Sequence, residues 1–117
     1  MLLSCAPGEY HTLALDALFA ALTEHQISVQ FLGPSAPLPA LLHAIEHTQP
    51  LVVFVWAQRT ATAQPTALRR LVPHTTAVAA GPGWSSTRLP ARVRWINSLP
   101  EAVALAREAT PPDPDPV

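Results

Sequence analysis

The chain alternates short apolar runs with stretches whose apolar residues recur at helical spacing, and this alternation limits the folds it can adopt. The runs are the expected strands, and they cover residues 2–6, 27–32, 51–56, 76–80 and 93–96. When strands alternate with helices, each helix returns the chain to the same edge of the sheet, so the strands pair in parallel. The sequence therefore predicts a single-domain α/β fold, flavodoxin-like (Rossmann-like) and doubly wound, with about five parallel strands.

Helices are expected between these runs. The first should begin near His11, and the second should end before Pro50. A third is expected over residues 66–71. Ser98 and Glu101 have the spacing of a capping box, in which two side chains satisfy the first N–H groups of a helix. They predict the start of the last helix.

Size and composition indicate one globular domain, which we place at residues 1–109. Residues 110–117 alternate proline with aspartate and are expected to form a disordered tail.

The net charge of −1 and the scattered basic residues provide no surface for nucleic acid or an anionic membrane. No apolar run reaches the roughly 18 residues of a membrane helix. The only cysteine, Cys5, rules out an internal disulfide and favours the reducing cytoplasm.

Three of the expected strands end in segments that suggest a binding site. Ligands of an open parallel sheet bind beyond the carboxyl ends of the strands, where the connections leave for opposite faces. The first, third and fourth strands lead into residues 8–12, 56–60 and 81–84. We expect these three segments to face one crevice.

Glu9 and His11 are the candidate metal-binding pair. A carboxylate two residues before a histidine can accept a hydrogen bond from one ring nitrogen while the other nitrogen binds a metal. That bond fixes the tautomer and raises the basicity of the metal-binding nitrogen. The pattern therefore predicts His11 as a metal ligand and Glu9 as the residue that orients it.

With these segments in this order, the chain resembles cobalamin-binding domains from Leu2 to about Ala109. Such domains occur in methionine synthase, in methylmalonyl-CoA mutase and in the MerR-type light- or cobalamin-sensing regulators, which it resembles most. The family carries Asp-x-His-x-x-Gly after strand one, Ser-x-Leu after strand three and Gly-Gly after strand four. Here residues 9–14 resemble the first element in the Glu-x-His form of the regulators, Trp56 and Gln58 stand at the serine and leucine positions, and Ala80-Gly81 replaces the glycine pair.

The resemblance implies that His11 ligates cobalt from the lower face of cobalamin. The dimethylbenzimidazole of the cofactor would then be displaced into a slot between sheet and helix. Gly33 and Thr60 would line the path of the nucleotide tail. The cofactor would be adenosylcobalamin or hydroxocobalamin. The other residues expected to contact it are Glu9, Tyr10, Thr12, Trp56, Gln58, Gly81, Gly83 and Trp84.

The implied function is a corrinoid-binding or corrinoid-sensing module that acts through a partner or as part of a regulator. We expect no enzymatic activity from this chain alone, because it has no nucleophile motif and no glycine-rich phosphate loop. In cobalamin enzymes the chemistry belongs to the cofactor and to a separate substrate domain. A homodimer or a protein partner would have to cover the upper face of the corrin.

Two departures from the family narrow the expected slot. Ala14 stands where the family has glycine, and Trp56 places an indole where a small hydroxyl meets the base. The indole would either fill the slot or serve as a platform on which a ligand ring stacks. If it fills the slot, the alternative function is a protein-interaction module that no longer binds cobalamin. A sensor of heme or another tetrapyrrole, with Cys5 near His11, is a further alternative.

His43 and His47 form a separate motif with Glu46, because residues 43–47 match the His-x-x-Glu-His pattern of inverted zinc metalloproteases. Two imidazoles one helical turn apart can bind zinc. A zinc site needs a further ligand, and none stands in a plausible second helix. We therefore expect two solvent-exposed histidines opposite the apolar stripe of the second helix.

Overall fold

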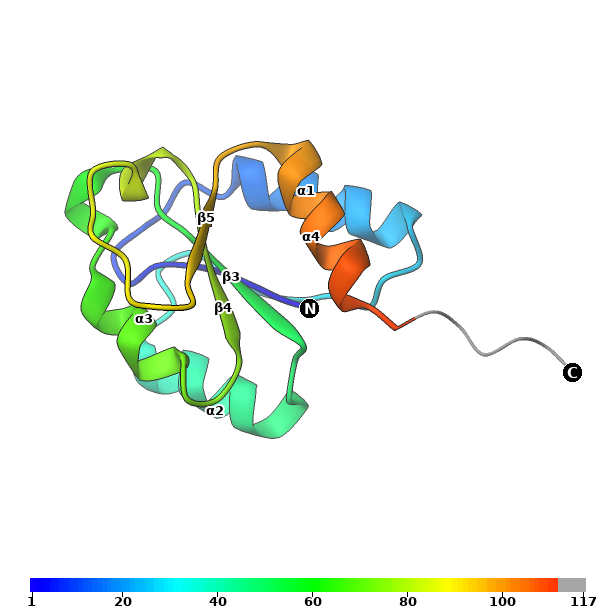
Figure 1. The fold of residues 1–117 in the computed structure, drawn as a ribbon, viewed down its shortest axis with the longest axis horizontal. Coiled ribbons are helices and arrows are strands. Elements are labelled where there is room, and N and C mark those ends of the chain that lie inside the picture. The colour runs from blue at the N-terminus through cyan, green and yellow to red at the C-terminus, as the bar shows by residue number, and fades with distance from the viewer. Residues whose placement is uncertain (112–117) are drawn as a thin grey trace, which may run out of the picture.

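The computed structural model describes residues 1–111 and consists of a parallel five-stranded sheet between two layers of helices (Figure 1). The strand order is β2-β1-β3-β4-β5. The strands are β1 (Leu2–Cys5), β2 (Gln30–Gly33), β3 (Val52–Trp56), β4 (Thr76–Ala80) and β5 (Arg94–Ile96). The helices are α1 (Leu13–Glu24), α2 (Leu38–Thr48), α3 (Pro65–Leu71) and α4 (Leu99–Ala109), with single turns η1 (Thr60–Thr62) and η2 (Pro82–Trp84). This confirms the flavodoxin-like, doubly wound fold.

The second strand starts three residues later than the sequence predicts, at Gln30 instead of Ile27. Ile27 is buried because it closes the end of α1. Its N–H donates to Leu22 O at 3.0 Å, and the N–H of Gln26, which has a φ of +60°, donates to Thr23 O at 2.9 Å. These are the two bonds of a Schellman motif, whose residue after the left-handed position is often apolar. The apolar residue therefore marks a helix end rather than a strand.

Helix α1 begins at Leu13, close to the predicted start near His11, with Thr12 as its N-cap. Thr12 donates its hydroxyl hydrogen to Asp16 Oδ2 at 3.3 Å. Leu51 lies outside β3 and is 51% exposed, so the central strand is shorter than expected. The predicted tail at residues 110–117 lies, from residue 112 onward, outside the described residues.

The start of α4 confirms the predicted cap. Ser98 Oγ accepts a hydrogen bond from the Glu101 N–H at 3.3 Å. The Glu101 carboxylate bonds the Ser98 hydroxyl at 2.9 Å rather than the backbone N–H of that residue. The cap satisfies one of the N–H groups that a helix start leaves without a partner.

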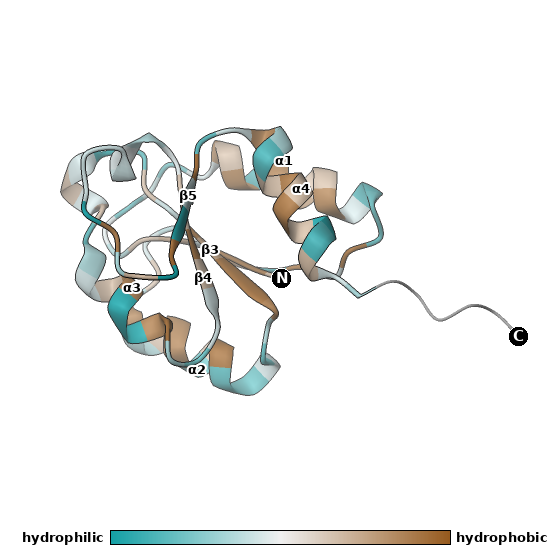
Figure 2. Ribbon diagram, viewed as in Figure 1, coloured by the Kyte–Doolittle hydropathy of each residue, from teal (hydrophilic) through white to brown (hydrophobic). Residues whose placement is uncertain are grey.

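The core lies on both faces of the sheet, and β3 is apolar along its length (Figure 2). The face that carries Leu3 and Phe54 packs under α1 and α4. At the carboxyl end of this face, four paired residues form one row across the sheet: Cys5, Trp56, Ala80 and Ile96. No helix among residues 1–111 is long and apolar enough to cross a membrane.

Gly81 follows β4 with a φ of +105°, and an added Cβ would lie 2.6 Å from Ala57 O and 2.9 Å from the Trp56 ring. Gly33 has a similar φ of +83°, but its Cβ would meet only the Phe31 ring, at 3.9 Å. Gly81→Ala should therefore lower the free energy of unfolding by at least about 3 kcal/mol, and Gly33→Ala by about 1 kcal/mol. Urea unfolding followed by circular dichroism measures both. Equal losses would show that no steric contact holds the Gly81 turn.

Candidate functional site

The strands are joined at their carboxyl ends by backbone hydrogen bonds that continue the ladder into the loops. The bonds are Ala6 N to Trp56 O at 2.9 Å, Ala57 N to Ala80 O at 3.0 Å and Gly81 N to Ile96 O at 3.0 Å. They bring together residues 8–12, 56–60 and 81–84, as the strand order requires.

The Glu9 carboxylate connects two of these segments. The side chain is fully buried, and both of its oxygens accept hydrogen bonds. Oε1 accepts from the Gln58 N–H at 2.7 Å, the Arg59 N–H at 3.3 Å and the Thr62 hydroxyl at 2.6 Å. Oε2 accepts from the backbone N–H of His11 at 3.3 Å and lies 2.6 Å from its Nδ1. The loop after β1 is thereby fixed to the loop after β3.

These hydrogen bonds decide the charge of Glu9. Burial raises the pKa of the carboxyl, but the bonds from Thr62, His11 and the Gln58 N–H outweigh burial and lower the pKa to about 2. Glu9 is therefore ionised at neutral pH. An ionised carboxylate 2.6 Å from Nδ1 requires the hydrogen to be on that nitrogen, so the Nε2 lone pair of His11 is the one available for a metal.

The His11 side chain is 59% exposed, although its Nδ1 atom lies against the buried Glu9 carboxylate. Its neighbours Tyr10 and Leu13 are the most exposed large apolar side chains described, at 69% and 82%. Leu13 was not expected at the site. An exposed imidazole beside exposed apolar surface is suited to a flat, partly apolar ligand.

A cavity of about 130 Å³ lies beside this end of the sheet, between the sheet, α1 and α4. Its walls include Ala14, Leu18, Trp56, Ala80, Ile96 and Ala102. Trp56 thus faces the place where the resemblance puts the slot for the base. Its Nε1–H is buried and has no hydrogen-bond partner among the described residues. The other two indoles differ, because Trp84 donates to Val55 O at 3.1 Å and Trp95 to Gly81 O at 2.8 Å.

Several predicted residues lie near the site without presenting side chains to the cavity. Gln58 is exposed and contributes its backbone N–H to Glu9. Thr60 is exposed at the start of η1, and Gly33 ends the outer strand β2. Neither lines the cavity.

The segment after β4 has a structural role. Gly83 donates to Ala57 O at 2.8 Å, and an added Cβ there would lie 2.5 Å from Arg59 O. Trp84 is 1% exposed and packs on the opposite face of the sheet, under α2 and α3. Trp84 therefore belongs to the core.

Cys5 is also a core residue. It is buried, and its thiol donates to His11 O at 3.6 Å. Burial, followed by the charge of Glu9, raises the pKa of the thiol to about 11. Cys5 is therefore protonated at neutral pH in this environment.

His43 and His47 lie on the exposed side of α2, with ring centroids 4.4 Å apart. Within residues 1–111 no group of three or more His, Cys, Asp or Glu side chains is placed to hold a metal ion. The expected exposed histidines are confirmed.

Two residues of the site could not be found from the sequence. Thr62 bonds Glu9 although 53 positions separate them. Ser35 accepts from the Gly8 N–H at 3.0 Å, and its own N–H donates to Glu9 O at 2.7 Å. Neither stands in a motif. Both are brought to Glu9 only when the carboxyl ends of the strands are aligned.

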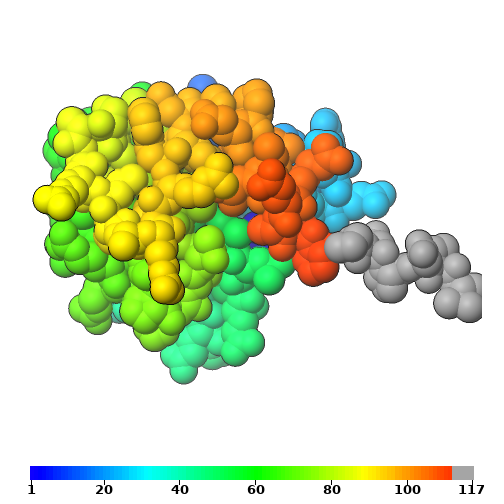
Figure 3. Space-filling view, viewed as in Figure 1, coloured from blue at the N-terminus to red at the C-terminus, as the bar shows by residue number. Residues whose placement is uncertain are grey.

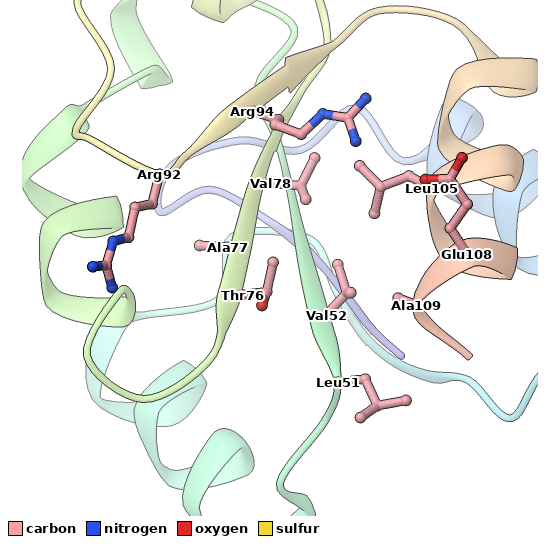
Figure 4. A pocket seen from close by; sticks show the side chains of 10 residues that line it. All are labelled: Leu51, Val52, Thr76, Ala77, Val78, Arg92, Arg94, Leu105, Glu108 and Ala109. Carbon is pink, nitrogen blue, oxygen red and sulfur yellow. The ribbon is translucent and has the colours of Figure 1, made fainter. Parts of the chain in front are cut away.

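A larger groove of about 420 Å³ lies at the other end of the sheet, where β3 and β4 begin (Figure 4). Arg94 extends across it toward Leu105 and Glu108, whereas Arg92 points to the other side. The connection from β4 to β5 and helix α4 form much of the face seen in Figure 3. This groove is remote from Glu9 and His11 and was not predicted from the sequence.

No protein-family model matches the chain, and no curated protein matches it by sequence. Solved structures do match in fold. A cobalamin-binding protein of Desulfitobacterium hafniense matches with a TM-score of 0.80 and 11% identity over 94% of this chain and 58% of that chain. The monomethylamine corrinoid protein of Methanosarcina barkeri matches with a TM-score of 0.76 and 16% identity over 93% and 57%.

A third match is to the methanol:cobalamin methyltransferase complex of Methanosarcina barkeri, with a TM-score of 0.75 and 18% identity over 92% of this chain and 44% of that one. The chain thus has the fold of corrinoid-binding proteins and spans about half of their length.

The low pKa of Glu9 predicts a loss of stability in acid. Folded Glu9 stays ionised down to a pKa of about 2, whereas the unfolded carboxyl takes up a proton near 4.5. The stabilisation is complete above the unfolded value and is lost as the pH falls toward the folded one. Between about pH 6 and pH 2.5, the free energy of unfolding should fall by roughly 2 kcal/mol more for the wild type than for Glu9→Gln. Urea unfolding at several pH values tests this. Parallel profiles would contradict it.

Proposed function

We propose that this chain is a corrinoid-binding module in which the Nε2 atom of His11 ligates cobalt from the lower face. The observation that carries the proposal is the 2.6 Å contact between Nδ1 of an exposed imidazole and the buried, ionised Glu9 carboxylate. A carboxylate, an imidazole and a metal in this order form a recurrent metal-binding arrangement. A single imidazole suits a metal whose equatorial ligands come from a macrocycle.

The surface around His11 supports a flat ligand. Tyr10 and Leu13, on either side of His11 in the sequence, are exposed. Covering their apolar surface would be favourable, because it removes that surface from water. A corrin ring resting on this end of the sheet would cover them. A bound corrinoid would supply a metal ion that accepts an imidazole, and His11 would hold it, with Glu9 setting the orientation and basicity of the ring.

The chain holds one proton in place for this task. Thr62 and the N–H groups of Gln58 and Arg59 stabilise the negative charge of Glu9, so the carboxylate does not take the Nδ1 proton. The proton stays on Nδ1, and the Nε2 lone pair is left free for a metal. The imidazole is therefore oriented before any ligand arrives, which lowers the entropic cost of binding.

The role we propose is binding or sensing through a partner, or as part of a cytoplasmic regulator, rather than catalysis by this chain alone. The fold match supports it, because one matched structure is a chain of a methanol:cobalamin methyltransferase complex. A second copy of the chain or a protein partner would cover the upper face of the corrin. One observation favours the alternative of a ligand-free interaction module: Trp56 occupies part of the expected slot.

The test is a titration of the purified chain in the dark with aquacobinamide, hydroxocobalamin and adenosylcobalamin, followed by the visible spectrum. Imidazole coordination should shift the cobalt bands with at least one of them, and His11→Ala should abolish the shift. His43→Ala is the matched control, because it removes an exposed histidine on α2. If folded wild-type protein shifts the spectrum of none of the three, the proposal is wrong, and heme is the next ligand to test.

Leu13→Asp should weaken corrinoid binding by about tenfold or more, since it places a charge under the ring. Stability should change by less than about 0.5 kcal/mol, because the side chain is 82% exposed. Leu51→Asp is the control, as Leu51 is 51% exposed but lies at the opposite end of the sheet. The same titration gives the dissociation constants. Equal affinity for wild type and Leu13→Asp would place the ring elsewhere.

A further inference from the structure

Trp56 lines the cavity between the sheet, α1 and α4, where the resemblance to cobalamin-binding domains puts the lower base. It ends β3 on the face covered by α1 and α4, in the row that also contains Cys5 and Ala80. Both neighbours in the row are small, so the indole is the one large side chain of β1, β3 and β4 at this level. It forms one wall of the cavity, and Ala14 of α1 contributes to another.

The indole is held in this position by its surroundings. Its Cε3 and Cζ3 atoms would lie only 2.9 Å from a Cβ at Gly81, so the six-membered ring rests closely against that glycine. The Nε1 atom lies at the opposite edge of the indole and has no partner among the described residues. Leaving a buried N–H unpaired is unfavourable. The position of the indole is therefore set by packing and not by a hydrogen bond. A ligand acceptor at this edge would give the unpaired N–H a partner.

The remaining space is about 130 Å³ and mainly apolar. An apolar cavity of about 150 Å³ holds one benzene ring. Dimethylbenzimidazole consists of two fused rings with two methyl groups and exceeds this space. The space is therefore close in size to one that holds a single ring, and a corrinoid without a lower base does not need it.

We propose that Trp56 makes the site selective for corrinoids whose lower base is absent or a single ring, against those with a benzimidazole. This inference rests on the proposed function, because it assumes that His11 binds cobalt. Trp56 then acts as a specificity residue. It leaves the metal-facing end unchanged and determines which tail can be accommodated beside it.

The test compares dissociation constants for aquacobinamide and hydroxocobalamin between the wild type and Trp56→Ser. Cobalamin must also release its own base from cobalt, so the ratio in the wild type alone does not isolate Trp56. Trp56→Ser should tighten cobalamin binding by about tenfold or more and change cobinamide binding by less than about threefold. Trp84→Phe is the control, because it alters a buried indole on the other face of the sheet.

A corrinoid with p-cresol as its lower base provides a second measurement that needs no variant. The wild type should bind it within about threefold of cobinamide and at least about tenfold more tightly than hydroxocobalamin. If Trp56→Ser does not fold, Trp56→Leu replaces it, with a smaller change in the same direction.

The two proposals fail in different ways. In one outcome, the wild type binds aquacobinamide and hydroxocobalamin, and the ratio of the two affinities is the same in Trp56→Ser. Trp56 is then not the specificity residue, while the proposed function stands. The same holds if the p-cresol corrinoid binds no better than cobalamin. If the wild type binds no corrinoid at all, both proposals are overturned.

Discussion

The buried carboxylate of Glu9 is the interaction on which the site depends. Burying a charge is costly unless hydrogen bonds replace its water, and donors from Gln58, Arg59, Thr62 and His11 do so here. Because these donors come from loops after two neighbouring strands, the charge also fixes those loops to each other. The orientation of His11 is thus a consequence of the fold. Removing Glu9 would change the loop positions as well as the imidazole, so its effect on binding must be compared with its effect on stability.

Much of this fold follows from the sequence by simple rules. Alternating apolar runs and helical stripes give the parallel sheet, and the parallel sheet places the segments after β1, β3 and β4 at one edge. The pairing of Glu9 with His11 joins residues two positions apart, so it can be predicted from the sequence. Ile27 was misassigned because a residue that closes a helix is as apolar as one in a strand. Pattern alone does not distinguish these two reasons for burial.

The rest of the site depends on distances that a linear pattern does not contain. Thr62 is an ordinary threonine in sequence and reaches Glu9 only because η1 folds back over the end of β3. Trp84 and Trp56 are equally apolar, yet one is in the core and the other lines the cavity, because they lie on opposite faces of the sheet. The sequence predicts that Trp56 narrows the slot implied by the resemblance. The space that remains depends on how Trp56, α1 and α4 pack together, which the sequence does not give.

The two ends of the site are built in different ways, and this difference bears on function. At the His11 end, the hydrogen bonds that Glu9 accepts hold one imidazole in one tautomer, an arrangement that tolerates little variation. At the cavity end, apolar contacts and one unpaired indole N–H set only a volume. Hydrogen-bonded geometry selects a chemical group, whereas an apolar wall selects size. Under the proposed function, such a domain would keep its affinity for cobalt while a change of one wall residue altered which corrinoid it accepts.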